Sequence, residues 1–325
     1  MATQQTLNQS TDATPTRKQF HDTDARDDEM GEAIEEWAEE LIDGAQDAAA
    51  SAEFQEWLDA QAQFSNLSWR NTLLIKMQMP DATEVATFNT WLYEFDRNVK
   101  EGEKALWIWE PMHRDTVCPK CGNTPGYHDR EHVECNNHEE GNPDEWDGGV
   151  VGFKPGARFD ISQTEGEPVP ELDTDAGAGD VADPEGLLAA TVEAGESLPV
   201  PTPELVAPED YNRAGHGVTK YVPQDGPTAI KVEHRAPAAT VSTAVHEYAH
   251  ALAHDAYDDD SREAQEVEAE ATAYVVGRHF GLDVTGSENY LAMWSDADAE
   301  EVRDRLARIS NNAQRIIQAI EDARE

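Results

Sequence analysis

The sequence predicts an α+β fold with two domains, and three observations support this class. Helical spacing of apolar residues marks both ends of the folded part, strand-like apolar runs lie between them, and an acidic, proline-rich stretch separates the halves. We therefore expect a disordered tail over residues 1–30, a first domain over 31–160, a connection over 161–210 and a second domain over 211–325.

The charge balance is strongly acidic, with 67 Asp and Glu residues against 24 Lys and Arg residues and a formal net charge of −43. Such a chain repels itself in dilute buffer, whereas roughly 1 M salt screens charges beyond about 3 Å. Because the acidic residues are spread along the chain, we expect a halophilic, cytoplasmic protein. A membrane partner is not expected, since no apolar run reaches about eighteen residues and the polar N-terminus lacks a secretory signal core.

Local patterns predict the elements of the two domains. In the first domain we expect helices around Ile34–Leu41 and Phe54–Leu58, and a third helix capped by Ser68; strands follow at Trp107–Trp109 and Val150–Phe159. A short helix is expected at Leu187–Val192 within the connection, and the second domain is expected to hold a β-hairpin, Val218–Val222 with Ala229–Val232. Three longer helices are expected at Ala238–Asp255, Ser261–Phe280 and Ala297–Asp322.

The most informative motif is an H-E-x-x-H sequence on the first of those helices, from His246 to His250. A spacing of four residues stacks both imidazoles on one helix face, so both reach one zinc ion. Glu247 is then placed to act as the general base of a metallopeptidase. A surface helix with two histidines is the plainer alternative, but the uncharged flanking residues favour a buried active-site helix. His254 continues the spacing and is a weak candidate ligand.

A catalytic zinc ion also needs a third protein ligand, and the next helix supplies carboxylates for it. Glu266 and Glu270 share a helix face with small residues that allow close approach to the histidine helix. We expect Glu266 to be the ligand and Glu270 to accept a hydrogen bond from a ligating imidazole. Glu268 is the rival ligand, and a solvated acidic face is the plain alternative for all three residues.

The three cysteines predict a second, structural zinc ion. Cys118 and Cys121 form one C-x2-C pair, and Cys135 and His138 form a C-x2-H pair, in a segment poor in apolar residues. His128 and His132 are possible substitutes for His138, and unpaired surface thiols are the alternative. We expect a zinc ribbon over residues 114–142, inserted in the first domain.

Residues 65–110 are nearly balanced in charge and rich in tryptophan, which could serve single-stranded nucleic acid through base stacking and phosphate contacts. From composition alone, packing in a core is the stronger explanation for these aromatic residues. The candidate DNA contacts are Trp69, Arg70, Trp91, Arg97, Lys100 and Lys104.

The chain resembles the ArdC-type antirestriction proteins. The resemblance rests on Ser65-Asn-Leu-Ser-Trp-Arg-Asn-Thr-Leu-Leu-Ile, Thr87-Phe-Asn-Thr-Trp, Val99-Lys-Glu-Gly-Glu-Lys-Ala, Phe159-Asp-Ile-Ser-Gln-Thr-Glu-Gly and His246-Glu-Tyr-Ala-His250. In addition, Glu266-Val-Glu-Ala-Glu270 is similar to the E-x-x-A-[END] signature of ImmA/IrrE-type peptidases, which favours Glu266 over Glu268. The resemblance implies an N-terminal single-stranded-DNA-binding domain and a C-terminal zincin-like metallopeptidase domain.

Three functional hypotheses follow. The first is a zinc protein that binds single-stranded DNA, has a peptidase site and acts against restriction of incoming DNA. The second is a regulatory protease that cleaves a repressor-type protein, and the third is a non-catalytic scaffold in which zinc holds the fold. The expected cofactors are one catalytic and one structural zinc ion, and the expected partners are single-stranded DNA and a protein or peptide substrate.

Overall fold

In the computed structural model of the chain, the described residues are 18–20, 24–43, 48–114, 117–118, 149–169, 181–213, 215–222, 226–253, 261–284 and 298–325. Helices and strands occur in both halves, so the α+β class predicted from the sequence is confirmed at that level. No helix among these residues has the length and apolar character needed to cross a bilayer.

The N-terminal half consists of three helices followed by two small antiparallel sheets. The longest pairing is the β3/β4 hairpin, and α4 packs near the end of β4. Ser68 caps α3 as expected, since its side chain accepts a hydrogen bond from the Asn71 amide. The elements are α1 (Arg26–Asp43), α2 (Ala48–Gln63), α3 (Trp69–Gln78), β1 (Val85–Ala86), α4 (Phe88–Tyr93), β2 (Arg97–Val99), β3 (Leu106–Arg114), β4 (Gly149–Asp160) and β5 (Thr164–Gly166), in sheets of order β1-β4-β3 and β2-β5.

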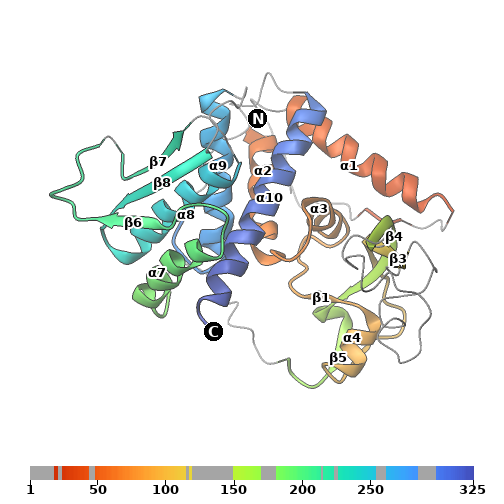
Figure 1. The fold of residues 1–325 in the computed structure, drawn as a ribbon. Helices are drawn as coiled ribbons and strands as arrows, with labels where there is room; N and C mark the ends of the chain where they lie inside the picture. Colours follow the sequence, from red (N-terminus) through yellow and green to blue (C-terminus); the bar gives the residue numbers. More distant parts are fainter. Residues whose placement is uncertain are drawn as a thin grey trace, which may run out of the picture.

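The C-terminal half places a three-stranded sheet against a group of helices (Figure 1). In the strand order β6-β8-β7, β8 pairs parallel with β6 and antiparallel with β7, so the predicted hairpin is confirmed and β7 is an edge strand. The elements are α7 (Pro184–Glu193), β6 (Pro203–Val206), β7 (Gly217–Val222), β8 (Gly226–Glu233), α8 (Pro237–Ala253), α9 (Arg262–His279) and α10 (Ala299–Asp322).

One hydrophobic core spans both halves. Figure 1 shows α10 between the α7–α9 group and the α1–α3 group, and α10 contacts members of both. Apolar side chains of α1, α2 and α3 belong to the same buried cluster as those of α8, α9 and α10. A smaller cluster lies under β3 and around Met79. The two predicted domains are therefore packed against each other rather than joined only by a linker.

Two predicted boundaries differ from the structure. Phe20 is buried, the Lys18 amide donates to the Met77 carbonyl at 3.0 Å, and α1 begins at Arg26, so the expected tail of residues 1–30 extends too far. The expected connection of residues 161–210 contains α7, whose Leu187 and Leu188 are buried, and β6, which pairs with β8. Helix α7 corresponds to the short helix expected at Leu187–Val192, whereas β6 was not expected, because only its pairing with β8 distinguishes it from the acidic connection.

Two of the tryptophans proposed to stack on DNA bases are core residues. Trp69 is 5% exposed and Trp91 is 1% exposed, and the Trp91 indole donates to the Phe159 carbonyl at 2.8 Å. Neither ring is accessible, so the base-stacking role predicted for them is wrong. The periodic apolar pattern around them reflects helix burial, the alternative that composition favoured.

We predict that Trp91→Ala lowers the free energy of unfolding by about 3–5 kcal/mol, because it removes a fully buried ring and leaves a carbonyl without its donor. Urea unfolding followed by circular dichroism would measure the change. Tyr93→Ala is the matched control: Tyr93 lies on the same helix and is 78% exposed, so a change within about 0.5 kcal/mol is expected. Similar losses in both variants would contradict the assignment of Trp91 to the core.

Candidate metal centre

Helix α8 carries the two histidines on a firmly anchored segment. Its Val245, Tyr248 and Ala249 are buried, which fixes the face that they share against the core. The Tyr248 hydroxyl donates to the Thr191 carbonyl of α7 at 2.9 Å, and burial raises the pKa of Tyr248 above its usual value. With these contacts fixed, the two imidazoles project from α8 on the side that faces α9.

Helix α9 brings the Glu266 carboxylate to the two imidazoles. The Nε2 atoms of His246 and His250 lie 3.0 Å apart, and Glu266 Oε2 lies 3.4 Å from each. Four ligands at zinc-bond lengths in a tetrahedron would be about 3.3–3.4 Å apart. The three atoms therefore form a triangle of the size that one such ion requires. Among the described residues, these three form the group whose ligand atoms lie close enough together to hold one metal ion.

The electrostatics of the cluster agree with its geometry. Hydrogen bonds from the imidazoles of His246 and His250 hold the pKa of Glu266 well below its usual range. The carboxylate is therefore ionised at neutral pH, which is the state needed of a metal ligand. Two ring nitrogens facing each other at 3.0 Å repel unless a proton or a cation lies between them, so the arrangement favours a bound cation.

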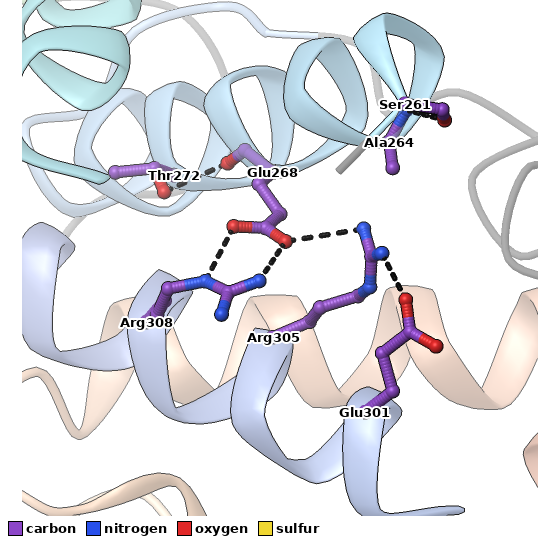
Figure 2. A network of polar contacts seen from close by, with 7 residues as sticks. All are labelled: Ser261, Ala264, Glu268, Thr272, Glu301, Arg305 and Arg308. Atoms are coloured by element: carbon purple, nitrogen blue, oxygen red, sulfur yellow. Dashed lines mark hydrogen bonds and ion pairs between the residues drawn. The ribbon is translucent and has the colours of Figure 1, made fainter. Parts of the chain in front are cut away.

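Glu268 is bound to two arginines of α10, so the rival assignment of Glu268 as the third ligand is wrong. Its carboxylate is buried and faces α10, where Arg308 binds both oxygens at 2.7 and 2.9 Å. Arg305 donates to the same carboxylate at 3.2 Å and is held in turn by Glu301 (Figure 2). Glu266 and Glu268 differ by about 200° around the helix, so α9 directs one toward α8 and the other toward α10.

Strand β7 supports the motif glutamate. Glu247 is 6% exposed, and its Oε2 accepts a hydrogen bond from the Thr219 hydroxyl at 2.7 Å. Gly217 lies directly against it, since a Cβ at that position would be 2.4 Å from Glu247 Oε1. Tyr221 donates to the His250 carbonyl at 2.8 Å. No sequence motif marks these three residues as part of the site, although positions 217, 219 and 221 alternate onto one face of β7.

Other predicted residues of this site are not brought together. Glu270 is exposed, and among the described residues no hydrogen bond joins it to an imidazole, so the orienting contact proposed for it is not formed. His254 lies outside the described residues. Of the predicted structural zinc site, Cys118 is buried, whereas Cys121, Cys135 and His138 lie outside the described residues. That second site stays a prediction.

The basic residues proposed to contact DNA have varied surroundings. Arg70 is exposed and lies over the Trp69 ring. Arg97 donates to Thr164 Oγ1 at 2.7 Å, while the ammonium groups of Lys100 and Lys104 donate to the Ser162 carbonyl and the Gln19 side chain. The aromatic residues that are accessible are different from those predicted: Phe88, Tyr93 and Phe153.

We predict that substituting Glu268 destabilises the fold strongly, whereas substituting Glu266 changes its stability little. In metal-free protein, Glu268→Gln should lower the free energy of unfolding by about 3–5 kcal/mol, because it leaves two arginines without their buried partner. Glu266→Gln should change it by no more than about 1 kcal/mol, because Glu266 is 43% exposed. Chemical unfolding in EDTA measures both changes. Equal destabilisation would show that the two carboxylates are not distinguished in this way.

Comparisons with known proteins give limited likeness. No protein-family profile matches the chain. It is 27% identical over 273 residues to an uncharacterized protein of Bacillus anthracis, covering 80% of this chain and 46% of that protein. The chain thus spans about half the length of the curated relative it matches. It is also similar to crystal structures of the antirestriction protein ArdC from plasmid R388, metal-free and Mn(II)-bound. The identities are 14% and 15%, each TM-score is 0.47, and 90% of this chain and 97% of ArdC are covered.

Proposed function

We propose that this chain is a divalent-metal-dependent peptidase, with zinc the expected ion at His246, His250 and Glu266. The observation that carries the proposal is the triangle of two imidazole nitrogens and one carboxylate oxygen, with sides of 3.0, 3.4 and 3.4 Å. Two histidines and one glutamate are a ligand set found at catalytic zinc, where the fourth position stays open for water or substrate. The donor set therefore fits the proposed group.

The chain's own residues supply the proton transfer. A bound cation of this kind would polarise the substrate carbonyl and acidify water. Glu247 takes the water proton as the water oxygen adds to the carbonyl carbon, and delivers it to the amine nitrogen as the C–N bond breaks. The Thr219 hydroxyl holds one Glu247 oxygen at 2.7 Å, which leaves the other oxygen for the water. An extended peptide is the proposed substrate, because β7 is an edge strand beside the motif.

Measurements of metal content and of peptide hydrolysis distinguish the peptidase hypothesis from the hypothesis of a non-catalytic scaffold. We predict that His246→Ala and Glu266→Gln abolish retention of the ion at this site, while Glu247→Gln retains it and loses hydrolysis by about 10²–10⁴-fold. Elemental analysis and cleavage of unfolded casein, in molar KCl with zinc or manganese, provide the measurements. Glu263→Gln is the control because Glu263 is exposed in the first turn of the same helix. Unchanged metal content in all variants would contradict the proposal.

We further propose that helix α4 and strand β2 form a single-stranded-DNA surface. Phe88 and Tyr93 on α4 are 47% and 78% exposed, and α4 packs on β2, which begins with Arg97 and is followed by exposed Lys100. Accessible aromatic rings beside basic side chains suit base stacking with phosphate contact. This surface replaces the buried Trp69 and Trp91 of the sequence prediction. Antirestriction is the biological role proposed for the two activities together.

For this surface we predict that Tyr93→Ala weakens binding of a fluorescent oligo-dT by about tenfold or more, because one stacked base contact is lost. Fluorescence anisotropy at low salt and in molar KCl would measure the affinity. Phe153→Ala is the control: its ring is also exposed, but it lies on β4 six residues, or about 20 Å, from the Phe159 end that α4 contacts. If Tyr93→Ala and Phe153→Ala weaken oligo-dT binding equally, the assignment of the DNA surface to α4 and β2 is contradicted.

A further inference from the structure

One buried hydroxyl near the motif glutamate lacks a hydrogen-bond partner. Within the described part of the chain, the Tyr211 hydroxyl oxygen is out of contact with solvent and neither donates nor accepts a hydrogen bond. Leaving such a group unpaired is costly, so each instance in a folded protein requires an explanation. Two other buried tyrosine hydroxyls among the described residues have partners: Tyr248 donates to Thr191 and Tyr274 donates to Asp59.

The topology places Tyr211 over the active-site end of the sheet. The chain leaves β6 at Val206 and enters β7 at Gly217, and both residues lie beside the same end of β8. Gly217 is the residue that abuts Glu247. Tyr211 lies midway in this connection, where its amide donates to the Ala207 carbonyl at 3.0 Å and closes a turn. A short connection that ends at Gly217, against Glu247, therefore carries the unpaired hydroxyl.

The charges around Tyr211 keep its proton in place. Burial raises the pKa of Tyr211, the Glu247 carboxylate raises it further, and Glu233 adds to the rise while Arg213 opposes it. At neutral pH the side chain is therefore a hydrogen-bond donor rather than a phenolate.

We propose that the Tyr211 hydroxyl donates a hydrogen bond to the substrate carbonyl oxygen as that oxygen gains negative charge. The inference rests on the proposed peptidase function and names a catalytic residue for it. When the water oxygen bonds to the carbonyl carbon, the carbonyl oxygen becomes an anion; Glu247 carries the water proton to the leaving nitrogen, and Tyr211 retains its own. A donor fixed in position and unoccupied in the free protein stabilises that charge without rearrangement.

Other candidates for this role are already occupied. Tyr274 donates to Asp59 at 2.6 Å and faces α2. His216 is paired with Glu233, with its Nδ1 at 2.6 Å from Oε2. Among the described tyrosines, Tyr211 therefore combines an unpaired hydroxyl with a place in the connection that ends at Gly217, against Glu247.

Tyr211→Phe tests the proposal, in cobalt-loaded protein whose visible spectrum reports ligand binding. The first probe is an N-blocked phosphinic analogue of a Leu-Ala dipeptide, whose tetrahedral oxygens mimic the charged carbonyl oxygen. The second is a mercaptoacyl dipeptide, which would reach the ion through sulfur. We predict that Tyr211→Phe weakens phosphinic binding by about 10²-fold and leaves thiol binding and cobalt affinity unchanged. Its melting temperature should equal or exceed that of the wild type, because an unpaired buried hydroxyl is removed.

Tyr274→Phe is the matched control with the opposite pattern. It removes a hydroxyl that has a partner, so it should lower the melting temperature and leave binding of both probes unchanged. Phosphinic binding by Tyr211→Phe equal to that of the wild type would overturn the role of Tyr211 alone, and so would a lower melting temperature for that variant. Wild-type protein that holds cobalt but binds neither probe would overturn the peptidase function as well. If the wild-type protein fails to bind cobalt, the proposed metal centre is contradicted.

Discussion

The buried ion pair between α9 and α10 is the contact on which the candidate centre depends. Glu268 is closed in by Arg305 and Arg308, and each of its oxygens is bonded. A buried pair of this kind adds little net stability compared with apolar residues, but rotating α9 away from it would leave the buried Glu268 carboxylate without its two arginine partners. The rotation of α9 is therefore fixed, and because Glu266 lies about 200° from Glu268, it faces α8. The candidate metal ligand Glu266 is therefore oriented by Glu268, a residue that faces away from the candidate site.

The same helices tie this centre to the N-terminal half. The far end of α9 is held by α2, where Asp59 accepts from Tyr274 at 2.6 Å and from Arg278 at 3.2 Å. The carbonyl oxygen of Ala62, also on α2, lies 3.0 Å from His279 Nδ1. Together with α10, these contacts place α9 inside one continuous core. The half that carries the proposed DNA surface and the half that carries the proposed peptidase site therefore share the element that orients Glu266, so a rearrangement in either half would act on that element.

Sequence reasoning succeeded where the information was local. Periodicity located α8 and α9, a spacing of four aligned His246 with His250, and the face count separated Glu266 from Glu268. It failed where burial depends on distant chain segments. The sequence alone allows Trp69 and Trp91 to be either buried core residues or exposed rings that stack on bases, and only the packing of the surrounding helices decides between the two. Leu205 and Val206 belong to an acidic segment, and only their pairing with β8 shows that they form a strand. Thr219 and Gly217 were missed because nothing local says which strand lies against Glu247.

The carboxylates of α8 and α9 show how stability and chemistry are divided in this fold. Glu268 has every oxygen paired and is withdrawn from solvent, which suits a residue that only holds position. Glu247 is equally withdrawn but has one protein donor, Thr219, and beside it lies a tyrosine hydroxyl with none. A core selected only for stability would pair or replace these groups. Buried side-chain atoms without a partner also occur in the N-terminal half, Gln61 Oε1 and Thr72 Oγ1 among them, so they are not confined to one region. What distinguishes Glu247 and Tyr211 is their chemistry: a carboxylate oxygen can accept a hydrogen bond from water, and a tyrosine hydroxyl can donate one to a carbonyl oxygen.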